Sequence, residues 1–254
     1  MPEIAVLLKV VPDTYAYPII DGDRVEWADD VEWVRDRFSQ FAVEEAVKTK
    51  EAVGGNITSY TITTVDNKKP MMKSLAIGVD NSVVIQNEEL FKSDVYSLAR
   101  ALGEEIKKQN PDILFAGKYS SDSNNRMVGN AVAAYLDIPI IADVTKLEVS
   151  ETGVVATRKI GTRKEIIEAE FPVMIITDKL NEPRYPKLPD LMKAKRKPME
   201  WKDTALTEAR NAAKVTNLAE PQKKEGEVVM INDGDMAERV AKLLELLKDT
   251  ENVL

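Results

Sequence analysis

The sequence predicts an α/β protein built on a doubly wound, mostly parallel sheet. Short continuous apolar runs, Ile4–Leu8, Val83–Ile85 and Ile113–Ala116, are typical of strands that are covered on both faces. Between residue 4 and about residue 140, such runs alternate with amphipathic helical patterns. That alternation favours parallel strands joined by helices that lie on both faces of one sheet.

The first strand, at Ile4–Leu8, leads to a turn at Pro12–Thr14, and Asp21–Asp23 predicts a hairpin turn. Strands and helices are then expected in alternation. The expected strands are 57–64, 83–85 and 113–116, and the expected helices are 38–53, 70–77, 95–106 and 128–136.

The helix that begins at Phe38 has Ser39 as a candidate N-cap, since serine accepts hydrogen bonds from free helix N–H groups. Glu44 precedes Lys48 by four residues, which predicts an exposed ion pair. Gly54 and Gly55 end this helix. Ser93 is a candidate N-cap for the helix at 95–106.

Beyond residue 140 the alternation of strands and helices ends. Four short strands are expected at 144–149, 154–160, 165–171 and 173–177, with a hairpin turn at Glu151–Gly153. They extend the sheet or form an antiparallel ribbon beside it.

Residues 181–225 contain several prolines and little apolar periodicity, so they are not expected to fold against their own domain. The last element is an amphipathic helix with apolar residues on one face, namely Met236, Val240, Leu243, Leu244 and Leu247. The pattern alone predicts that residues 181–254 form an arm that docks on another chain.

Composition excludes several kinds of chemistry. The 254 residues include no Cys and no His, which excludes disulfides, thiolate nucleophiles, Cys/His zinc sites and His-based triads. The 35 Lys and Arg against 43 Asp and Glu give a net charge of −8, which argues against nucleic-acid binding. No run approaches the ~20 apolar residues of a membrane span, and the first run lacks a signal-peptide cleavage site. We expect a cytoplasmic protein with no metal site and no catalytic side chain.

The stretch Gly117–Arg126 follows a predicted strand and is dense in hydroxyl and amide side chains. Ligands of open α/β sheets lie beyond the carboxyl ends of the strands, where helix N-termini favour phosphate. Gly117 lets the chain turn without a Cβ clash, and Arg126 can neutralise phosphate charge. The alternative is a plain hydrophilic loop, because Ser, Asn and Asp favour turns anyway. The chain has neither a G-x-G-x-x-G nor a Walker A pattern, which disfavours an NAD-type or P-loop site.

A longer pattern points to a family. The segment Leu180–Pro186, followed by Leu188–Pro198, closely resembles the signature of the electron transfer flavoprotein beta subunit. The resemblance extends through Lys9–Asp13, Ala42–Ala46 and neighbouring motifs at 75–80 and 111–117. It covers nearly the whole chain and weakens after about residue 200.

The resemblance implies an αβ heterodimer with an adenine nucleotide alpha hydrolase-like beta chain. The alpha subunit would hold most of the FAD, and the beta chain would bind AMP. Electrons would pass from flavin dehydrogenases, such as acyl-CoA dehydrogenases, to a quinone oxidoreductase. Residues 1–200 would form the nucleotide-binding domain, and residues 201–254 an arm and helix that pack on the alpha subunit.

Carried over position by position, the resemblance implies two sets of site residues. The nucleotide pocket would comprise Leu7, Phe38, Ser39, Ile62, Thr63, Gly117, Lys118, Tyr119, Ser120, Ser121, Asp122, Ser123, Asn124, Asn125, Arg126, Met127 and Val128. A partner-docking loop, 184–195, would comprise Arg184, Tyr185, Leu188, Leu191, Met192 and Lys193. Leu188, between Pro186 and Pro189, would be a preorganised apolar anchor. The alternative is a proline-rich surface turn with a partly buried leucine. The basic residues of 193–197 would steer an acidic protein partner.

The sequence departs from the family at two places. Thr162 and Arg163 stand where the family has a Gly-Gly pair, which puts flavin contacts from this turn in doubt, and Glu165 keeps the place of the family's Glu. Asp122–Arg126 lacks the Asp-Gly-Asp loop with a following Gln that electron-bifurcating members tend to show. This favours AMP over a second FAD with NADH as donor. A non-redox adenine-nucleotide module is a further alternative.

Overall fold

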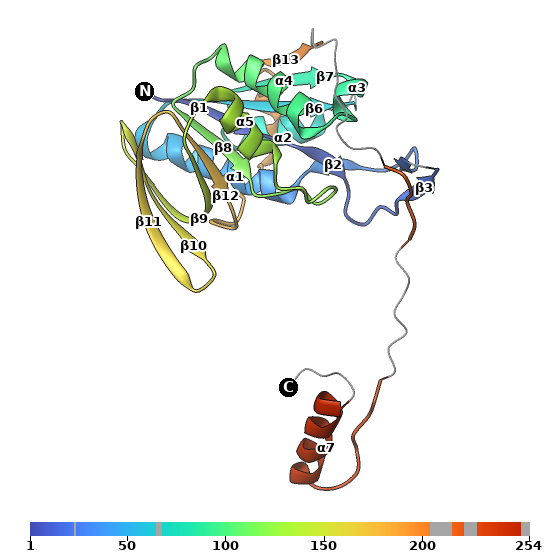
Figure 1. Cartoon of the computed structure of the whole chain (residues 1–254). Coiled ribbons are helices and arrows are strands. Elements are labelled where there is room, and N and C mark those ends of the chain that lie inside the picture. Colours follow the sequence, from blue (N-terminus) through green and yellow to red (C-terminus); the bar gives the residue numbers. More distant parts are fainter. Residues whose placement is uncertain (23, 65–67, 204–214, 221–227, 250–254) are drawn as a thin grey trace. The chain divides into compact units, whose positions relative to one another are not determined.

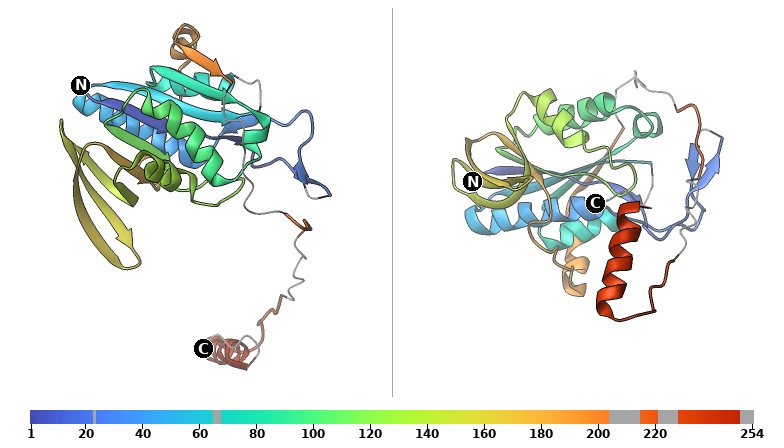
Figure 2. Two further views of the ribbon diagram at one scale, coloured as in Figure 1. Left: turned by 45° about the horizontal axis from the view of Figure 1, so that its top comes forward. Right: turned by 60° about the horizontal axis from the view of Figure 1, so that its bottom comes forward.

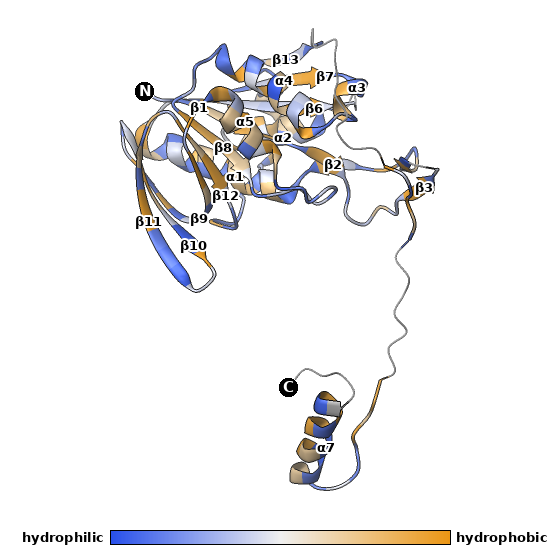
Figure 3. Cartoon of the chain, viewed as in Figure 1, coloured by the Kyte–Doolittle hydropathy of each residue, from blue (hydrophilic) through white to orange (hydrophobic). Residues whose placement is uncertain are grey.

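A nine-stranded sheet with helices on both faces forms the core of the first structural unit (Figures 1 and 2). The structure is a computed structural model that describes residues 1–22, 24–64, 68–203, 215–220 and 228–249. It divides into two units, Met1–Asn217 and Leu218–Leu254. The central strands are mostly hydrophobic, as Figure 3 shows.

The sheet has the strand order β11-β10-β9-β12-β8-β1-β6-β7-β13. All neighbours pair in parallel except β9 with β10 and β10 with β11, which are antiparallel. The strands are β1 (Glu3–Leu7), β6 (Asn56–Thr63), β7 (Asn81–Gln86), β8 (Ile113–Gly117), β9 (Ile140–Val149), β10 (Gly153–Ile160), β11 (Arg163–Glu170), β12 (Val173–Thr177) and β13 (Met199–Lys202). The predicted parallel sheet is therefore confirmed, and the strands after residue 140 both extend it and add an antiparallel ribbon.

The chain winds the sheet in two directions from β1. It adds β6 and β7 on one side and then crosses over to add β8 and β12 on the other. The strand order thus reverses between β1 and β8, the switch point at which open α/β sheets hold their ligands.

Helices cover both faces because the central strands are apolar on both sides. From β1, Ile4 and Val6 pack in a cluster with Ala42 and Val47, whereas Ala5 and Leu7 pack in the opposite cluster with Leu102. The first face carries α1 (Arg37–Val53), α2 (Lys69–Ile77) and α6 (Leu188–Ala194), and the second carries α3 (Glu88–Phe91), α4 (Val95–Lys107) and α5 (Val128–Leu136).

Two short antiparallel pairs also belong to the described part of this unit. β2 (Val10–Pro12) pairs with β5 (Trp33–Arg35), and β3 (Ile19–Asp21) pairs with β4 (Arg24–Glu26). The predicted hairpin turn at 21–23 is confirmed by the pairing of Asp21 with Arg24, although Asp23 itself lies outside the described residues.

Both predicted helix caps are wrong by one to three residues. Asp36, not Ser39, caps α1, because its Oδ2 accepts from the N–H groups of Phe38 and Ser39 at 2.9 and 3.1 Å. Asp94, not Ser93, caps α4 by accepting from Ser97 N at 2.9 Å. In each case the aspartate stands directly before the first helical residue, which is where its carboxylate reaches the free N–H groups.

The prediction that residues 181–225 leave their own domain is wrong for 181–202. Within this segment α6 packs beside α2, and β13 adds a parallel strand to β7. Lys197 fixes the connection, since its ammonium donates to the carbonyl oxygens of Leu75 and Val79 at 2.9 and 2.6 Å. Main-chain pairing, the Lys197 contacts and the packing of Met199 and Trp201 against the core hold a segment that has little apolar periodicity over most of its length.

The second unit contains α7 (Met236–Asp249), which confirms the predicted C-terminal helix. Its apolar residues Met236, Val240, Leu243 and Leu244 are exposed, and the mixed colours along α7 in Figure 3 follow this amphipathic pattern. Of the expected arm, residues 204–214, 221–227 and 250–254 lie outside the described residues. Packing of the arm on an alpha subunit stays a prediction.

Candidate functional site

A cavity of about 290 Å³ lies at the carboxyl ends of β1, β6 and β8, beside the switch point. One part of its wall is apolar and comes from the strands and from α3 and α4; it comprises Leu7, Tyr60, Ile62, Phe91, Leu98, Leu102 and Ile176. The other part is polar and comes chiefly from the 117–127 loop and the end of β1; it comprises Lys9, Ser39, Ser120, Asp122, Ser123, Asn125 and Arg126. A cavity with this division suits a small ligand that has an apolar ring and a polar or anionic tail.

Gly117 allows the loop to leave β8 at this point. A Cβ on Gly117 would lie 2.6 Å from the carbonyl carbon of Phe38 and 2.7 Å from its oxygen. Any other residue would push the start of α1 away from the end of β8. The predicted reason for glycine at this position, avoidance of a Cβ clash, is confirmed.

Asp36 ties the loop to α1. Its Oδ1 accepts from both the backbone N–H and the hydroxyl of Ser121, at 2.8 and 3.0 Å, while its Oδ2 caps the helix. The residue is 1% exposed, so both carboxylate oxygens are committed inside the protein. One buried carboxylate therefore fixes the helix start and the loop together.

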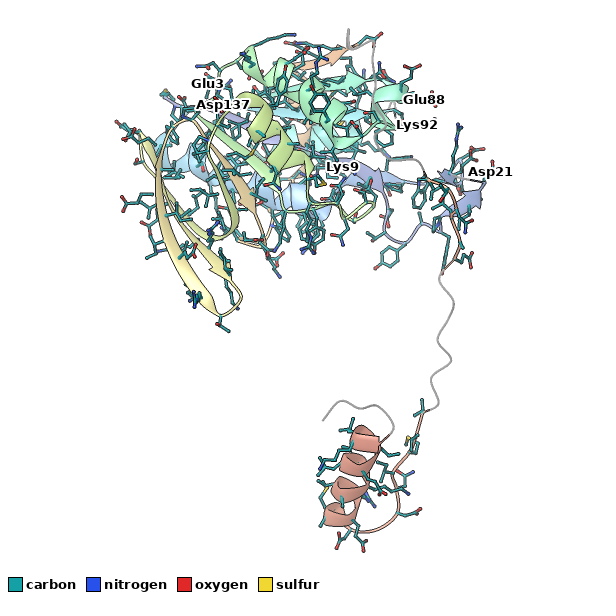
Figure 4. All side chains as sticks on the ribbon, viewed as in Figure 1. Glu3, Lys9, Asp21, Glu88, Lys92 and Asp137 are labelled. Atoms are coloured by element: carbon teal, nitrogen blue, oxygen red, sulfur yellow. The ribbon has the colours of Figure 1, made fainter. Side chains whose placement is uncertain are left out.

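Lys9, which is labelled in Figure 4, lies two residues beyond β1 and ties the 117–127 loop to that end of the strand. Its ammonium lies 2.7 Å from Asp122 and donates to Ser120 Oγ at 3.1 Å. Burial alone would raise the pKa of the Asp122 carboxyl, but the charge and the hydrogen bond of Lys9 outweigh it and hold the pKa below its ordinary value. The pair brings a cation, a carboxylate and hydroxyls to the polar wall of the cavity.

A stack of side chains joins the cavity wall, at Tyr119 and Arg126, to Phe38 behind it. The rings of Tyr119 and Phe38 have centroids 3.7 Å apart, and the guanidinium carbon of Arg126 lies 5.1 Å from the centroid of Tyr119. Phe38 also meets Phe41 edge-on at 5.9 Å. Arg126 is thereby held at the cavity wall by a cation–π contact.

Lys118 forms ion pairs with two aspartates from neighbouring parts of the sheet. Its ammonium lies 2.5 Å from Asp143, which is within β9, and 3.2 Å from Asp178, which directly follows β12. The hydrogen bond to Asp143, followed by that to Asp178, raises the pKa of Lys118 although burial opposes the shift. This side chain links the carboxyl ends of β8 and β12 to the middle of β9, while its residue lines the cavity.

Most of the predicted pocket residues meet at this cavity. The residues that line it are Leu7, Ser39, Ile62, Gly117, Lys118, Tyr119, Ser120, Asp122, Ser123, Asn125, Arg126, Met127 and Val128. The predicted residues that are not part of its wall are Phe38, Thr63, Ser121 and Asn124. Thr63 follows Ile62 on β6 and so points to the opposite face, whereas Phe38 and Ser121 support the loop from behind.

Sequence reasoning missed several wall residues, chiefly Lys9, Tyr60, Phe91, Leu98, Leu102 and Ile176. Lys9 directly follows the first strand, so the rule that ligands lie at carboxyl ends was a usable signal for it. Leu98 and Leu102 belong to the apolar stripe of α4, and no sequence pattern separates a cavity wall from ordinary core.

The predicted docking loop has an exposed apolar tip and a charged base. Leu188 is 75% exposed and Tyr185 is 89% exposed, with Met192 also exposed. Leu191 is half-buried, and Lys193 lies 3.5 Å from Asp190. The leucine is the first residue of α6 and stands between two prolines. Its exposure contradicts the partly buried side chain of the alternative, while its use as a docking anchor stays a prediction.

The base of this loop is held by α1. Arg184 bonds to both oxygens of Glu44 and both oxygens of Glu51. The predicted exposed pair of Glu44 with Lys48 is wrong, because Glu44 is 3% exposed and faces Arg184 instead. The hydrogen bond from Arg184 also lowers the pKa of Glu51.

The turn that departs from the family pattern joins β10 to β11. Ile160 pairs with Arg163, so Gly161 and Thr162 form a two-residue turn in which Gly161 has φ 57° and supplies the left-handed conformation. Glu165 of β11 is paired within this chain. Its carboxylate accepts a 2.8 Å hydrogen bond from Arg158, the residue directly opposite on β10.

Among the residues that the structure describes, no cluster of three or more acidic side chains could hold a metal ion. No helix within the described ranges is long and apolar enough to cross a membrane.

The chain is similar to electron transfer flavoproteins. A family model described as the electron transfer flavoprotein domain matches residues 27–207. The electron transfer flavoprotein subunit beta of Bacillus subtilis (strain 168) is 33% identical over 257 residues, which cover 98% of this chain and 98% of the relative. The protein of the same name from Thermoanaerobacterium thermosaccharolyticum is 31% identical over 192 residues, or 75% of this chain and 74% of the relative. A probable electron transfer flavoprotein subunit beta of Saccharomyces cerevisiae is 30% identical over 225 residues, or 85% and 84%.

Proposed function

This chain belongs to the electron transfer flavoprotein family as a beta subunit, and from that premise we propose that it carries electrons together with an alpha subunit. The alpha subunit holds most of the FAD, and this chain holds AMP in the cavity at the switch point. Flavin dehydrogenases, such as acyl-CoA dehydrogenases, donate the electrons, and a quinone oxidoreductase accepts them.

The observation that carries the nucleotide proposal is the divided wall of the cavity. Leu98, Leu102 and Tyr60 offer an apolar slot for the purine ring. Lys9 and Arg126 offer positive charge for the phosphate, and Ser120 and Ser123 offer hydroxyls. Among the described residues, no side chain caps the start of α5, which supports an anion at that helix end.

The cavity volume supports AMP over a second FAD. At about 290 Å³, it lies just below the usual range for ligand pockets, roughly 300–1,000 Å³. FAD would add a second phosphate, a ribityl chain and a three-ring isoalloxazine to the same adenylate. A single-nucleotide site is therefore the better fit, and it gives a carrier rather than a bifurcating enzyme.

Flavin supplies the redox chemistry of the heterodimer when it is bound. This chain's residues need only bind, orient and exclude water, which agrees with a sequence that has no His and no Cys. The docking loop then serves the donor, because its exposed Leu188 can enter an apolar pocket and the exposed Lys187, Lys193 and Lys195 can steer an acidic surface. Lys197 does not take part, since its ammonium donates to two backbone carbonyls.

The test of the carrier role uses the heterodimer made by co-expression with its alpha subunit. Mixed anaerobically with an acyl-CoA dehydrogenase and its acyl-CoA substrate, the flavin absorbance of the heterodimer should fall. Leu188→Ala should slow this reduction without changing the resting flavin spectrum.

Ile166→Ala is the matched control, because Ile166 is an aliphatic residue of β11 with a similar exposure, 73%. This control should reduce at the parent rate. Equal rates for parent and Leu188→Ala with every acyl-CoA dehydrogenase of the organism would remove Leu188 from the docking assignment.

A further inference from the structure

We infer that Arg184 is a positioning residue for partner docking, which α1 clamps so that the exposed tip at Tyr185–Met192 is already in its docking shape. In this assignment Arg184 does not contact the partner. The inference rests on the proposed docking function, and it assigns to α1 a role in that function.

The clamp is bidentate on both sides. The Nε and Nη2 atoms of Arg184 donate to Glu44 at 3.0 and 2.8 Å, and Nη1 and Nη2 donate to Glu51 at 2.5 and 3.0 Å. Glu44 and Glu51 are seven residues apart and so share one face of α1. A guanidinium held by two carboxylates in this way has no donor pair left for a partner.

The clamp also fixes the main chain. Residues 181–188 are all described, and within them Arg184 has the one backbone N–H with an assigned acceptor, Glu44 Oε2 at 3.0 Å. Pro183 and Pro186 on either side have no N–H to donate. The path of the segment therefore depends on Arg184 more than on any regular secondary structure.

Two further contacts mark this segment as an anchored base. Asn181 donates to Glu45 of α1 at 2.5 Å, and Arg37 donates to Glu182 at 3.1 Å. Beyond Arg184 the contacts with α1 give way to exposed side chains, namely Tyr185 and Leu188. A loop held at its base and free at its tip loses less conformational entropy on docking than an unheld one.

The test compares Arg184→Gln, Arg184→Lys and the parent in the flavin-loaded heterodimer. Arg184→Gln should raise the KM for the heterodimer with the acyl-CoA dehydrogenase roughly fivefold, because the loop must be ordered during docking, and should leave kcat unchanged. Trypsin cleavage after Lys187, followed by mass spectrometry, should become faster. Arg184→Lys should recover part of both effects, since it keeps the charge but not the fork.

Controls separate this inference from the docking proposal. Arg100→Gln, which breaks the exposed pair with Glu104 on α4, should change neither KM nor cleavage. Glu51→Gln removes the exposed side of the clamp and leaves Glu44 paired, so it tests the clamp even if Arg184→Gln folds poorly; it should raise both KM and cleavage.

Unchanged KM and cleavage in both Arg184→Gln and Glu51→Gln, while Leu188→Ala still slows transfer, would overturn the clamp and leave docking intact. Faster cleavage in the clamp variants with no kinetic effect of Leu188→Ala would reject the docking proposal, and with it the positioning role. A fall in kcat at unchanged KM would also overturn the inference, because it would place Arg184 at the electron-transfer step.

Discussion

The cavity and the docking loop both rest on α1, but they are built in opposite ways. At the cavity, polar groups face inward and bind one another, with Asp36 holding Ser121 and Lys9 holding Asp122. At the docking loop, the polar base is bound to α1 and the apolar tip faces outward. The first arrangement suits retention of a small ligand, and the second suits a brief encounter with a protein surface.

The contrast between base and tip predicts the largest stability effect. Arg184→Met should lower the free energy of unfolding by about 3 kcal/mol, because it leaves the buried Glu44 carboxylate unpaired. Tyr185→Ala, one residue away at the exposed tip, should change it by less than about 0.5 kcal/mol. Urea denaturation of the heterodimer measures both. Similar losses of unfolding free energy in the two variants would contradict the distinction between a bound base and a free tip.

At the cavity, the buried carboxylate of Asp36 has a role like that of Glu44, because it holds the loop to α1. Asp36→Ala should cost about 2 kcal/mol, the upper range for loss of an N-cap, because the tie to Ser121 is lost as well. Asp36→Ser keeps a cap acceptor but not both ties, so it should lie between parent and Asp36→Ala. Thermal unfolding ranks the three proteins, and a parent-like Asp36→Ala would show that the shared carboxylate is dispensable.

The next prediction concerns the affinity of the cavity for AMP and the part that Lys9 plays in it. Lys9→Met should weaken AMP binding by about tenfold or more, because a charge-assisted hydrogen bond to phosphate contributes about 1.5–3 kcal/mol. Leu188→Ala should leave AMP binding unchanged. Isothermal titration of the nucleotide-stripped heterodimer gives both affinities. Equal affinities for parent and Lys9→Met would remove Lys9 from the phosphate site.

The smallest expected effect is a difference in pH dependence between the two regions. Burial raises the pKa of Glu45 above 4.5 although Asn181 and Lys48 oppose the shift. The folded state then binds more protons than the unfolded state above pH 4.5, so stability from this group is lost as pH rises through the raised pKa. Asp122 is the reverse case, because its pKa lies below 3.8 and its contribution is lost as pH falls.

Glu45→Gln should therefore gain stability at neutral pH, and Asp122→Asn should lose it, each by less than about 1 kcal/mol. The loss in Asp122→Asn should vanish below its lowered pKa, where the parent is protonated too. Denaturation curves at a series of pH values test this, and shifts of the same sign for both variants would contradict the assignment.

The sequence predicted the elements whose determinants are local. The apolar runs of β1, β7 and β8 and the stripes of α4 and α7 were readable because burial imposes a period on nearby residues. The loop after β8 was readable because strand ends and ligands coincide in this class of fold.

What the sequence did not predict depends on distant partners. Glu44 looks like an exposed helical residue until Arg184, 140 residues later, is placed beside it. Asp36 gains its second role from Ser121, 85 residues away. β13 alternates apolar and polar residues over only four positions, Met199–Lys202, and this short pattern becomes a strand because β7 offers an open edge. Such pairings arise only when the chain is folded, and no local pattern specifies them.

The most direct test of the account is the nucleotide content of the heterodimer purified from its own cells. Heat denaturation followed by chromatography of the released small molecules should give one AMP and one FAD per heterodimer. Two FAD and no AMP, or no adenine nucleotide beyond the alpha subunit's FAD, would contradict the claim that the switch-point cavity of this chain holds a single nucleotide.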